Sequence, residues 1–557
     1  MNRNVEAHFS ELPSIDIDRS TFDRSSEHKT SFNVGQLIPF YVDEVLPGDT
    51  FKVTTSAVVR LQTLLTPVMD NMYMDTYYFF VPNRLVWEHW KQFCGENTAS
   101  PWYPTTSYSI PKLYPPTNGW NVGTIADYMG IPVGTDIGSD IWPSALPFRA
   151  YAMICDQWFR STPLQDPLNI SVGDTVAQGS NGANQITDIQ LGGSPFMANK
   201  YHDYFTSCLP SPQYGTGVTI FGNPYGSFTS TIDPKGMVPV IADSKHDRYG
   251  EDYFVLKDTV SNTDSRAKRT TAALATGVYN LTWTAQTNGY DNIVPTNLWA
   301  EVGQLQLSIN QLRLAFQLQK WQEKAARGGS RYHELLQEMF SVRPLDQRVQ
   351  IPEYLGGHRF PLAIHQVANQ SQSATDFLGD LGAMSNTSDV HEDFIKSFTE
   401  HGYVIGVCVV RYDHSYPQGL ERMWFREDPM EFYWPVFSSL GEQPVRKGEI
   451  CVSGTATDYD VFGYQEAWAE YRYKPSRVSG EMRPGIANSL ASWHLSDYYT
   501  SVPSLSASWI REEKANVDRV LAVQSSTSNQ IFCDFYIQNI CTRPMPMYSI
   551  PGLIDHH

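Results

Sequence analysis

Histidines beside acidic residues are the first groups in this sequence whose spacing could support chemistry. The stretch "HELLQ", residues 333–337, resembles a zinc-peptidase helix, in which histidines four positions apart bind the metal. Gln337 stands where the second histidine is needed, so His333 would be a lone ligand. The stretches "HEDF" at 391–394 and "IDHH" at 554–557 are too short and isolated to define a metal site. We therefore predict no metal centre and no cofactor.

The sequence also lacks the common catalytic motifs. It contains no G-x-S-x-G, Walker A or G-x-G-x-x-G motif between a predicted strand and a helix. Glu427, Asp428 and Glu431 lie close together in the chain. Paired-carboxylate catalysis depends on a separation in space that sequence does not give. We predict that the chain is not an enzyme.

The stretch "ARGGSRY", residues 326–332, is the remaining candidate site. Arg327 and Arg331 flank Gly328 and Gly329. A helix that begins after two glycines presents free backbone N–H groups to an anion, and Arg331 would add positive charge. The same glycines can end one helix and allow the next to begin. We predict that Gly328 and Gly329 are primarily a structural joint.

Basic residues gather around this joint, although the chain is acidic, with a formal net charge of −18. Such a chain is not a general nucleic-acid binder. Near the joint, however, six basic residues outnumber Glu323, Glu334, Glu338 and Asp346. The excess is only two charges, so pairing with acidic groups on a neighbouring subunit is favoured over contact with phosphate. The candidates for DNA or inter-subunit contact are Lys320, Lys324, Arg327, Arg331, Arg343 and Arg348.

Hydrophobic periodicity predicts the elements that position these residues. A helix is predicted from 309 to about 326, apolar on two sides, with Trp321 and Ala325 buried. Strands are predicted near both ends of the chain, with long helical and irregular insertions between them. The resulting fold is a large antiparallel β sandwich or barrel. The predicted strands include "NMYMDTYYFFVP" at 71–82, "HGYVIGVCVVRYD" at 401–413, "YQEAWAEYRYKPSR" at 464–477 and "IFCDFYIQNICTRPMPMY" at 531–548.

Two segments differ from this pattern. Residues 1–40 are polar with spaced apolar residues, which predicts an extended N-terminal arm at 1–45 before a main domain at 46–557. Residues 215–298 are rich in Gly, Thr, Ser, Asn and Asp with short β-like runs, which predicts an inserted, exposed surface protrusion.

Cysteines and apolar runs indicate where the chain folds. Seven scattered cysteines without a C-x-x-C motif predict buried, reduced thiols and a reducing cytoplasm. No signal peptide is recognised, and the longest strongly apolar run, 403–410, is too short to span a bilayer, so no membrane insertion is predicted. These features argue against a secreted carbohydrate-binding or carbohydrate-active β protein. That class is the alternative, because the many Tyr and Trp residues could form a sugar platform.

Long ordered motifs resemble the major capsid protein of Microviridae, in particular of gokushovirus-like single-stranded DNA bacteriophages. The resemblance is carried by "LQKWQEKAARGGSRYHELLQEMFSVRPLDQRVQIPEYLGG" at 318–357, "KYHDYFTSCLPSPQYG" at 200–215 and "YQEAWAEYRYKPSRVSGEMRP" at 464–484. It implies a mainly β fold, an eight-stranded viral jelly roll with large loop and helical insertions. It also implies self-assembly into a T = 1 icosahedral capsid around a circular single-stranded DNA genome, without catalytic residues.

The resemblance implies partners and a location as well. Within the virion the partners are other copies of the chain and the single-stranded DNA genome. Further phage partners are a small basic DNA-binding protein, an internal scaffolding protein and a DNA pilot protein. The insertion at 215–298 would surround the threefold axes and serve in host attachment to a bacterial surface receptor. The capsid would be assembled in the cytoplasm of the bacterial host.

Overall fold

The computed structural model describes residues 18–97, 106–134, 142–215, 309–370 and 378–548, with five short strands between 240 and 300. The chain divides into two compact units. Unit 1 comprises Met1–Tyr214 and Glu323–His557, and unit 2 comprises Gly215–Gln322.

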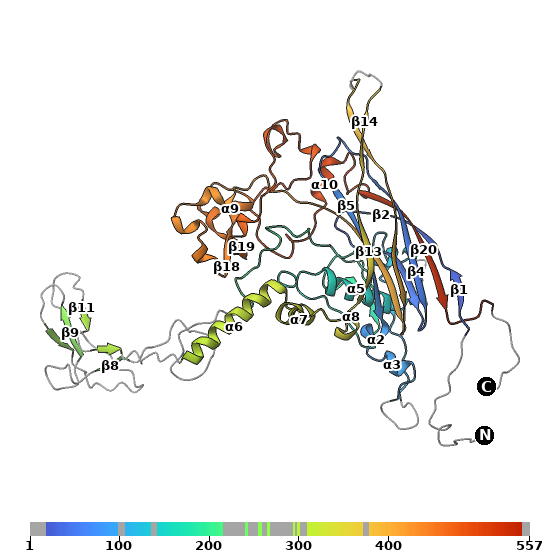
Figure 1. The fold of residues 1–557 in the computed structure, drawn as a ribbon, viewed down its shortest axis with the longest axis horizontal. Helices are drawn as coiled ribbons and strands as arrows, with labels where there is room; N and C mark the ends of the chain where they lie inside the picture. The colour runs from blue at the N-terminus through green and yellow to red at the C-terminus, as the bar shows by residue number, and fades with distance from the viewer. Residues whose placement is uncertain are drawn as a thin grey trace. The chain divides into compact units, whose positions relative to one another are not determined.

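Two antiparallel sheets, each with four strand positions, form the centre of unit 1 (Figure 1). In the first sheet, β1 and β2 pair in succession with the same edge of β20. The first sheet contains, in spatial order, β1 (Ser20–Asp23) with β2 (Ser26–Phe32), then β20 (Ile531–Arg543), β4 (Thr50–Leu61) and β16 (Thr387–Ser397). The second sheet contains β13 (Glu353–Pro361), β5 (Met72–Pro82), β17 (Gly402–Tyr412) and β3 (Ile38–Val45).

The main core lies between the two sheets. In β20, buried and exposed residues alternate from Ile531 onward, as expected for a strand with one face on the core and one in solvent. Phe40 of the second sheet stacks on Phe535 of the first, with ring centroids 4.5 Å apart. Aromatic contacts of this kind join the two sheets into a sandwich.

The second sheet is covered on its other face as well. β17 is buried along almost its whole length, because the helix α5 (Leu146–Ile154) lies over this face of the sheet (Figure 1). The residues of β17 on this face belong to the same buried cluster as Trp87 and Trp120. α5 continues into the single π-helical turn η2 (Cys155–Phe159) and ends at Arg160. This layer explains why the strand at 402–412 reads as a continuous apolar run in the sequence.

Shorter elements complete unit 1. The remaining β pairs are β6 (Leu113–Tyr114) with β7 (Ala177–Gln178), β14 (Ile364–Ala368) with β15 (Leu381–Ser385), and β18 (Glu442–Arg446) with β19 (Val461–Glu466). Besides α5, the described α-helices here are α2 (Asn83–Val86), α3 (Trp90–Phe93), α4 (Ile125–Tyr128), α7 (Tyr332–Phe340), α8 (Asp346–Val349), α9 (Lys447–Ile450) and α10 (Ala515–Val520). The 3₁₀ turns are η3 (Ile189–Leu191), η4 (Arg422–Phe425), η5 (Pro429–Glu431), η6 (Pro435–Phe437), η7 (Ala456–Tyr459), η8 (Ala469–Tyr471), η9 (Gly480–Met482) and η10 (Ala491–Trp493).

Unit 2 contains short strands and most of the helix α6 (Ile309–Gly328), which runs on into unit 1. Its strands form an antiparallel pair and a three-stranded antiparallel sheet. The pair is β12 (Leu298–Ala300) with β8 (Val240–Ala242), and the sheet is β10 (Asp264–Ala267), β9 (Phe254–Asp258) and β11 (Ile293–Pro295). The other residues of the predicted protrusion, apart from Gly215, lie outside the described residues.

The mainly antiparallel β architecture and the predicted strands at 71–82, 401–413 and 531–548 are confirmed. The strand predicted at 464–477 is wrong beyond Glu466, where β19 ends and the 3₁₀ turn η8 follows. The predicted arm differs from the structure. Residues 18–45 form β1, β2 and β3, whereas residues 1–17 lie outside the described residues. Most side chains of β2 are at least partly exposed, and its place in the sheet is fixed by backbone pairing with β20. The polar composition of β2 therefore did not indicate a strand in the sequence.

The helix predicted at 309–326 is confirmed as α6, but its second buried face is only partly present. Ala325 is 2% exposed, as predicted, whereas Trp321 is 44% exposed. Apolar periodicity identifies the faces of a helix that can be buried. Within the single chain, only part of the second apolar face of α6 is covered. All seven cysteines are free, and all but Cys94 are buried, which agrees with the prediction of buried, reduced thiols. Within the described residues, no helix is long and apolar enough to cross a membrane.

Candidate functional site

Two glycines separate α6 from α7. Gly328 is the last residue of α6, and Gly329 has a φ of +97°, in the region that favours glycine. A Cβ atom on Gly329 would lie 2.2 Å from Oε2 of Glu334. The Glu334 carboxylate occupies this space because it accepts a hydrogen bond from the backbone N–H of Arg331, 3.0 Å away, at the start of α7. A side chain at position 329 would displace the group that caps the next helix.

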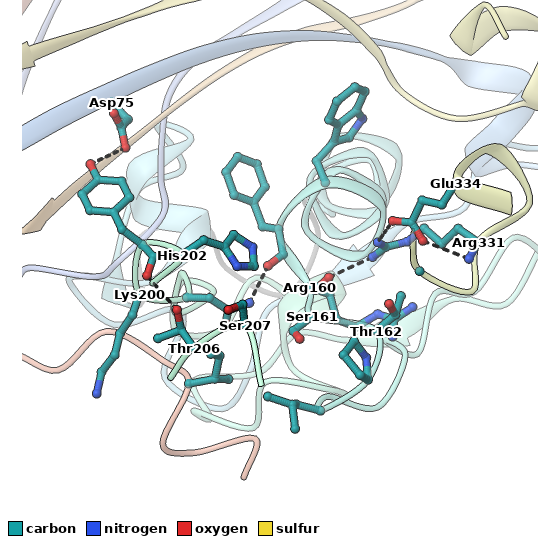
Figure 2. A pocket seen from close by; sticks show the side chains of 18 of the residues that line it. Asp75, Arg160, Ser161, Thr162, Lys200, His202, Thr206, Ser207, Arg331 and Glu334 are labelled. Atoms are coloured by element: carbon teal, nitrogen blue, oxygen red, sulfur yellow. Dashed lines mark hydrogen bonds and ion pairs between the residues drawn. The ribbon is translucent and has the colours of Figure 1, made fainter. Parts of the chain in front are cut away.

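Arg331 connects this joint to the end of η2 (Figure 2). Its Nη1 donates to Oε1 of Glu334 at 2.9 Å. Its Nη2 donates to the backbone carbonyl oxygen of Arg160 at 3.0 Å and also to that of Asp156. Its side chain is largely buried. The charge of Arg331 is therefore engaged by groups of its own chain, inside unit 1.

The other five basic candidates are not brought together into one site. Arg327 forms an ion pair with Glu442, whose side chain is almost fully buried. Lys320, Arg343 and Arg348 are exposed, and Lys324 is half-buried. Of the six candidates, only Arg327, Arg331 and Arg343 line a common cavity.

This cavity, of about 1140 Å³, lies within unit 1 and is rich in basic and aromatic residues. Its acidic lining residues are Asp75 and Glu334 (Figure 2). The basic lining residues outside the predicted set are Arg160, Lys200, Arg359 and Arg411, with His202 and His358 beside them. The aromatic lining residues are Tyr77, Phe79, Trp158, Phe159, Tyr201 and Tyr354. Sequence reasoning missed these residues because they come from distant segments.

Asp75 organises one wall of the cavity. Its buried carboxylate accepts hydrogen bonds from Nη2 of Arg411 at 2.5 Å and from the hydroxyl of Tyr201 at 2.8 Å, and Nε of Arg359 lies 3.6 Å away. The guanidinium carbons of both arginines lie over the Tyr201 ring, at 4.1 and 4.2 Å from its centroid. Burial, followed by the charge of Asp75, raises the pKa of Tyr201 and keeps its hydroxyl protonated. Two cations therefore share one carboxylate, which leaves a local positive excess.

Such a lining could bind a polyanion, because guanidinium groups contact phosphate and aromatic rings stack on bases. Several of its cations are nevertheless paired within the chain. Nε of Arg160 lies 2.7 Å from Asp156, and Nζ of Lys200 lies 3.5 Å from Asp497. The internal pairs indicate that most of these charges hold segments of unit 1 together.

The histidine-containing stretches have different environments. His333 lies in α7, where burial lowers its pKa and favours the neutral ring. His391, from the stretch "HEDF", lies beside His358 and Asp389. Among the described residues, this is the one group of His, Cys, Asp or Glu spaced to hold a metal ion. A usable sequence signal was the pattern Asp389-x-His391-x-Asp393, which places three polar side chains on one face of a strand.

Large apolar side chains are exposed along the segment 420–440. Trp434 is 52% and Val436 is 87% exposed, and other exposed large apolar side chains lie near them in the sequence. On a soluble protein, exposed apolar side chains that gather in one region generally mark a site that binds a partner. We call the following exposed residues the 420–440 surface: Leu420, Met423, Trp424, Met430, Phe432, Tyr433, Trp434, Val436 and Leu440.

Comparison with known proteins shows similarity along almost the whole chain. Residues 10–553 match the family described as "Capsid protein (F protein)". The chain is 40% identical over 535 residues to capsid protein VP1 of Spiroplasma virus 4, covering 94% of each protein. It is 37% identical to capsid protein VP1 of Chlamydia phage 1, covering 98% of this chain and 97% of that protein. It is also 37% identical to capsid protein VP1 of Bdellovibrio phage phiMH2K, covering 99% of this chain and 98% of that protein.

Proposed function

Because the chain belongs to the capsid protein (F protein) family, we propose that its copies assemble into a closed T = 1 icosahedral shell around a circular single-stranded DNA genome. Membership of this family makes the chain a structural protein of a phage virion and not an enzyme. The alternative of a secreted carbohydrate-active protein has no support among these relatives.

The observation that carries the assembly proposal is the 420–440 surface. Its large apolar side chains are exposed in the single chain, and burying them removes apolar area from water. A second copy of the chain is the partner that a closed homomeric shell provides. Sedimentation of the chain expressed with its internal scaffolding protein tests the proposal. Fast-sedimenting particles are expected, and a single slow monomer species at all concentrations would contradict it.

The sandwich supports a finer assignment, the viral jelly roll. With β1 and β2 counted as one position, the two sheets contain eight strand positions, which we number in chain order. The first sheet then has the spatial order 1-8-3-6 and the second has 5-4-7-2. This arrangement corresponds to a double Greek key. The segment between β5 and β13 carries the α5 layer, unit 2, α6 and α7 as one long insertion.

The first prediction concerns the N-terminal arm, restricted to residues 1–17. Deleting residues 2–17 should lower particle yield while the chain still folds, because the deletion leaves β1 and all other described strands intact. Particle yield by sedimentation and the thermal midpoint of the unassembled chain check the two parts. Unchanged yield would remove the proposed role of the arm in contacts between subunits.

The second prediction concerns residues 215–298, which we propose form a surface protrusion for host attachment. Unit 2 is a compact unit of its own, so its exchange should leave the sandwich intact. Exchanging the segment for that of a phage with another host should change adsorption at least about tenfold, since one lost hot spot costs about 2 kcal/mol or more and about 1.4 kcal/mol is tenfold. Assembled particles with unchanged adsorption would refute the attachment role.

Genome packaging brings further proposed partners. With a formal charge of −18, the chain contributes little overall neutralisation of DNA. We therefore assign most of that neutralisation to the small basic DNA-binding protein, with the DNA pilot protein as a further virion component. Six buried free cysteines suit assembly in the reducing cytoplasm of the bacterial host. We propose a primarily structural role in the shell for the joint at Gly328 and Gly329 and for the basic residues around it. DNA contact is their secondary role.

The third prediction tests that ranking with Arg331→Ala. The change removes the hydrogen bonds to Glu334 and to two backbone carbonyl groups, at about 1.5–3 kcal/mol for bonds to a charged donor. We expect fewer particles, each with the normal amount of DNA. Arg60→Ala, at an exposed site in β4 outside the six candidates, is the matched control and should leave yield and DNA content unchanged. Full yield of particles that lack DNA would instead make Arg331 a genome-binding residue.

A further inference from the structure

Three titratable side chains lie at alternating positions on the edge strand β16. The side chains of Asp389 and His391 are largely buried and that of Asp393 is fully buried, whereas Val390 and Glu392 between them are exposed. The inward face of a sandwich strand is normally apolar, so charged groups at these positions need a physical reason. Asp393 lies where the register of β16 shifts, and its side chain is 0% exposed.

The edge strand of the other sheet, β13, supplies His358 beside them. The rings of His358 and His391 have centroids 4.3 Å apart. Oδ2 of Asp389 lies 2.8 Å from Nδ1 of His391 and 3.7 Å from Nε2 of His358. The three ligand atoms all lie within 4.8 Å of one another. They are therefore grouped across the edge between the two sheets.

The backbone is shaped for this close approach. β13 has a register shift between Tyr354 and Gly356, and β16 has one between Glu392 and Phe394. A Cβ atom on Gly356 would lie only 2.2 Å from the backbone oxygen of Asp393. Glycine at this position lets the two edge strands meet.

A second layer of side chains orients His391. Its Nε2 lies 2.9 Å from Oδ1 of Asp393, and that oxygen has no hydrogen bond of good geometry among the described residues. The other carboxylate oxygen accepts a 2.5 Å hydrogen bond from Thr55, whose hydroxyl lies 2.7 Å from that of Tyr78. Metal-binding histidines generally donate their second N–H to a carboxylate, which fixes the ring. Asp393 is placed to accept that bond.

We propose that His358, Asp389 and His391 bind one divalent transition-metal ion of the zinc class at the edge between the two sheets. Nε2 of His358, Nδ1 of His391 and one Asp389 oxygen are the ligands, with water in the fourth position. Two imidazoles and one carboxylate favour such an ion over calcium or magnesium, which prefer oxygen ligands. Binding releases the proton that His391 shares with Asp389. His358 is 42% exposed, which gives the ion a route from solvent.

A cluster without a metal is the competing explanation. Burial lowers the pKa of His391, but hydrogen bonds and charges from Asp393 and Asp389 outweigh it and raise the pKa overall. A protonated His391 between two carboxylates would also place inward charges on an edge strand, which discourages pairing with other chains. Under that explanation the chain would not bind zinc specifically, and replacing His358 would not change its affinity for zinc.

The full-length chain is first freed of metal with a chelator. Its affinity for Zn²⁺ is then measured by competition with a chromophoric chelator, and its binding of Co²⁺ is followed by the visible absorption spectrum. We expect one ion per chain and a four- or five-coordinate cobalt spectrum. His358→Ala and Asp389→Asn should each weaken zinc binding by about 100-fold or more, because each removes a ligand. Asp393→Asn should weaken it by about 10- to 100-fold, as for other second-layer carboxylates. His365→Ala removes an exposed histidine of β14 outside the cluster and should bind like the unmodified chain.

The exposed position of His358 makes its alanine variant a fair test, because folding does not depend on a buried contact there. The thermal midpoint without zinc should match that of His365→Ala, and zinc should raise it only in the control. Equal zinc affinity in the two variants would overturn the proposal. Absence of stoichiometric uptake by the unmodified chain would overturn it as well and would favour the protonated cluster. Neither result depends on particle assembly.

Discussion

Replacing Trp434 and Val436 with glutamate will prevent the chain from assembling into particles and will leave the single chain folded. Both side chains are already exposed, so the change costs little in the monomer. At a contact between subunits, each glutamate would be buried without a partner, at a cost of several kcal/mol. Since about 1.4 kcal/mol corresponds to a tenfold change in affinity, particle yield should fall by at least about 100-fold.

Sedimentation and electron microscopy measure this yield, and circular dichroism confirms the fold. Val122→Glu is the matched control, because Val122 is 79% exposed and lies outside the 420–440 surface. The control should assemble at normal yield. Normal particles from the double variant would show that the 420–440 surface is not buried between subunits.

His414→Ala will strongly destabilise unit 1. The ring of His414 is almost fully buried, with Nδ1 2.8 Å from Asp497 and Nε2 2.9 Å from Glu512. Asp497 also accepts hydrogen bonds from Tyr499 and Asn516. Removing the ring leaves two buried carboxylates without their shared cation, and breaking such a buried pair costs about 3–5 kcal/mol. Denaturant unfolding of the unassembled chain should show this loss, and His365→Ala should not.

The same cluster gives stability a defined pH dependence. Burial lowers the pKa of His414, but the charges of Glu512 and Asp497 outweigh it and raise the pKa to about 10. Because this value exceeds the unfolded value of 6.5, the contribution is complete below pH 6.5 and is lost as the pH rises toward 10. The pKa of Asp497 is lowered, despite burial, chiefly by His414, so its contribution is lost as the pH falls below 3.8. Stability that is equal at pH 6 and pH 9 would contradict the charged state of this cluster.

The strands could be predicted from sequence wherever their buried positions are occupied by apolar residues in a recognisable pattern. β5 and β17 are buried on both faces, and β20 alternates, so their residue patterns identify them. β2 could not be found in this way, because its backbone pairs with β20 while most of its side chains remain at least partly exposed. The pairing joins segments about 500 residues apart, as in the register of Ser26 with Ile537, and no local pattern encodes it.

The candidate sites were predictable to a smaller extent. The glycine joint could be predicted because Gly328 and Gly329 are adjacent in the sequence and interrupt the helical pattern between two predicted helices. The cavity was not, since Asp75 meets Arg359 and Arg411 only after three strands have paired in one sheet. His391 was judged by its immediate neighbours, whereas its partner His358 comes from the other sheet. Trp321 was expected to be buried because periodicity does not distinguish a face covered within the chain from one left exposed.

Cryo-electron microscopy of particles purified from cells that express the chain with its scaffolding protein is the most direct test of the proposed assembly. We expect a closed T = 1 icosahedral shell in which the jelly-roll sandwich is the repeating unit and the 420–440 surface is buried between neighbouring copies. Open aggregates, or a shell in which Trp434 and Val436 remain exposed to solvent, would contradict it.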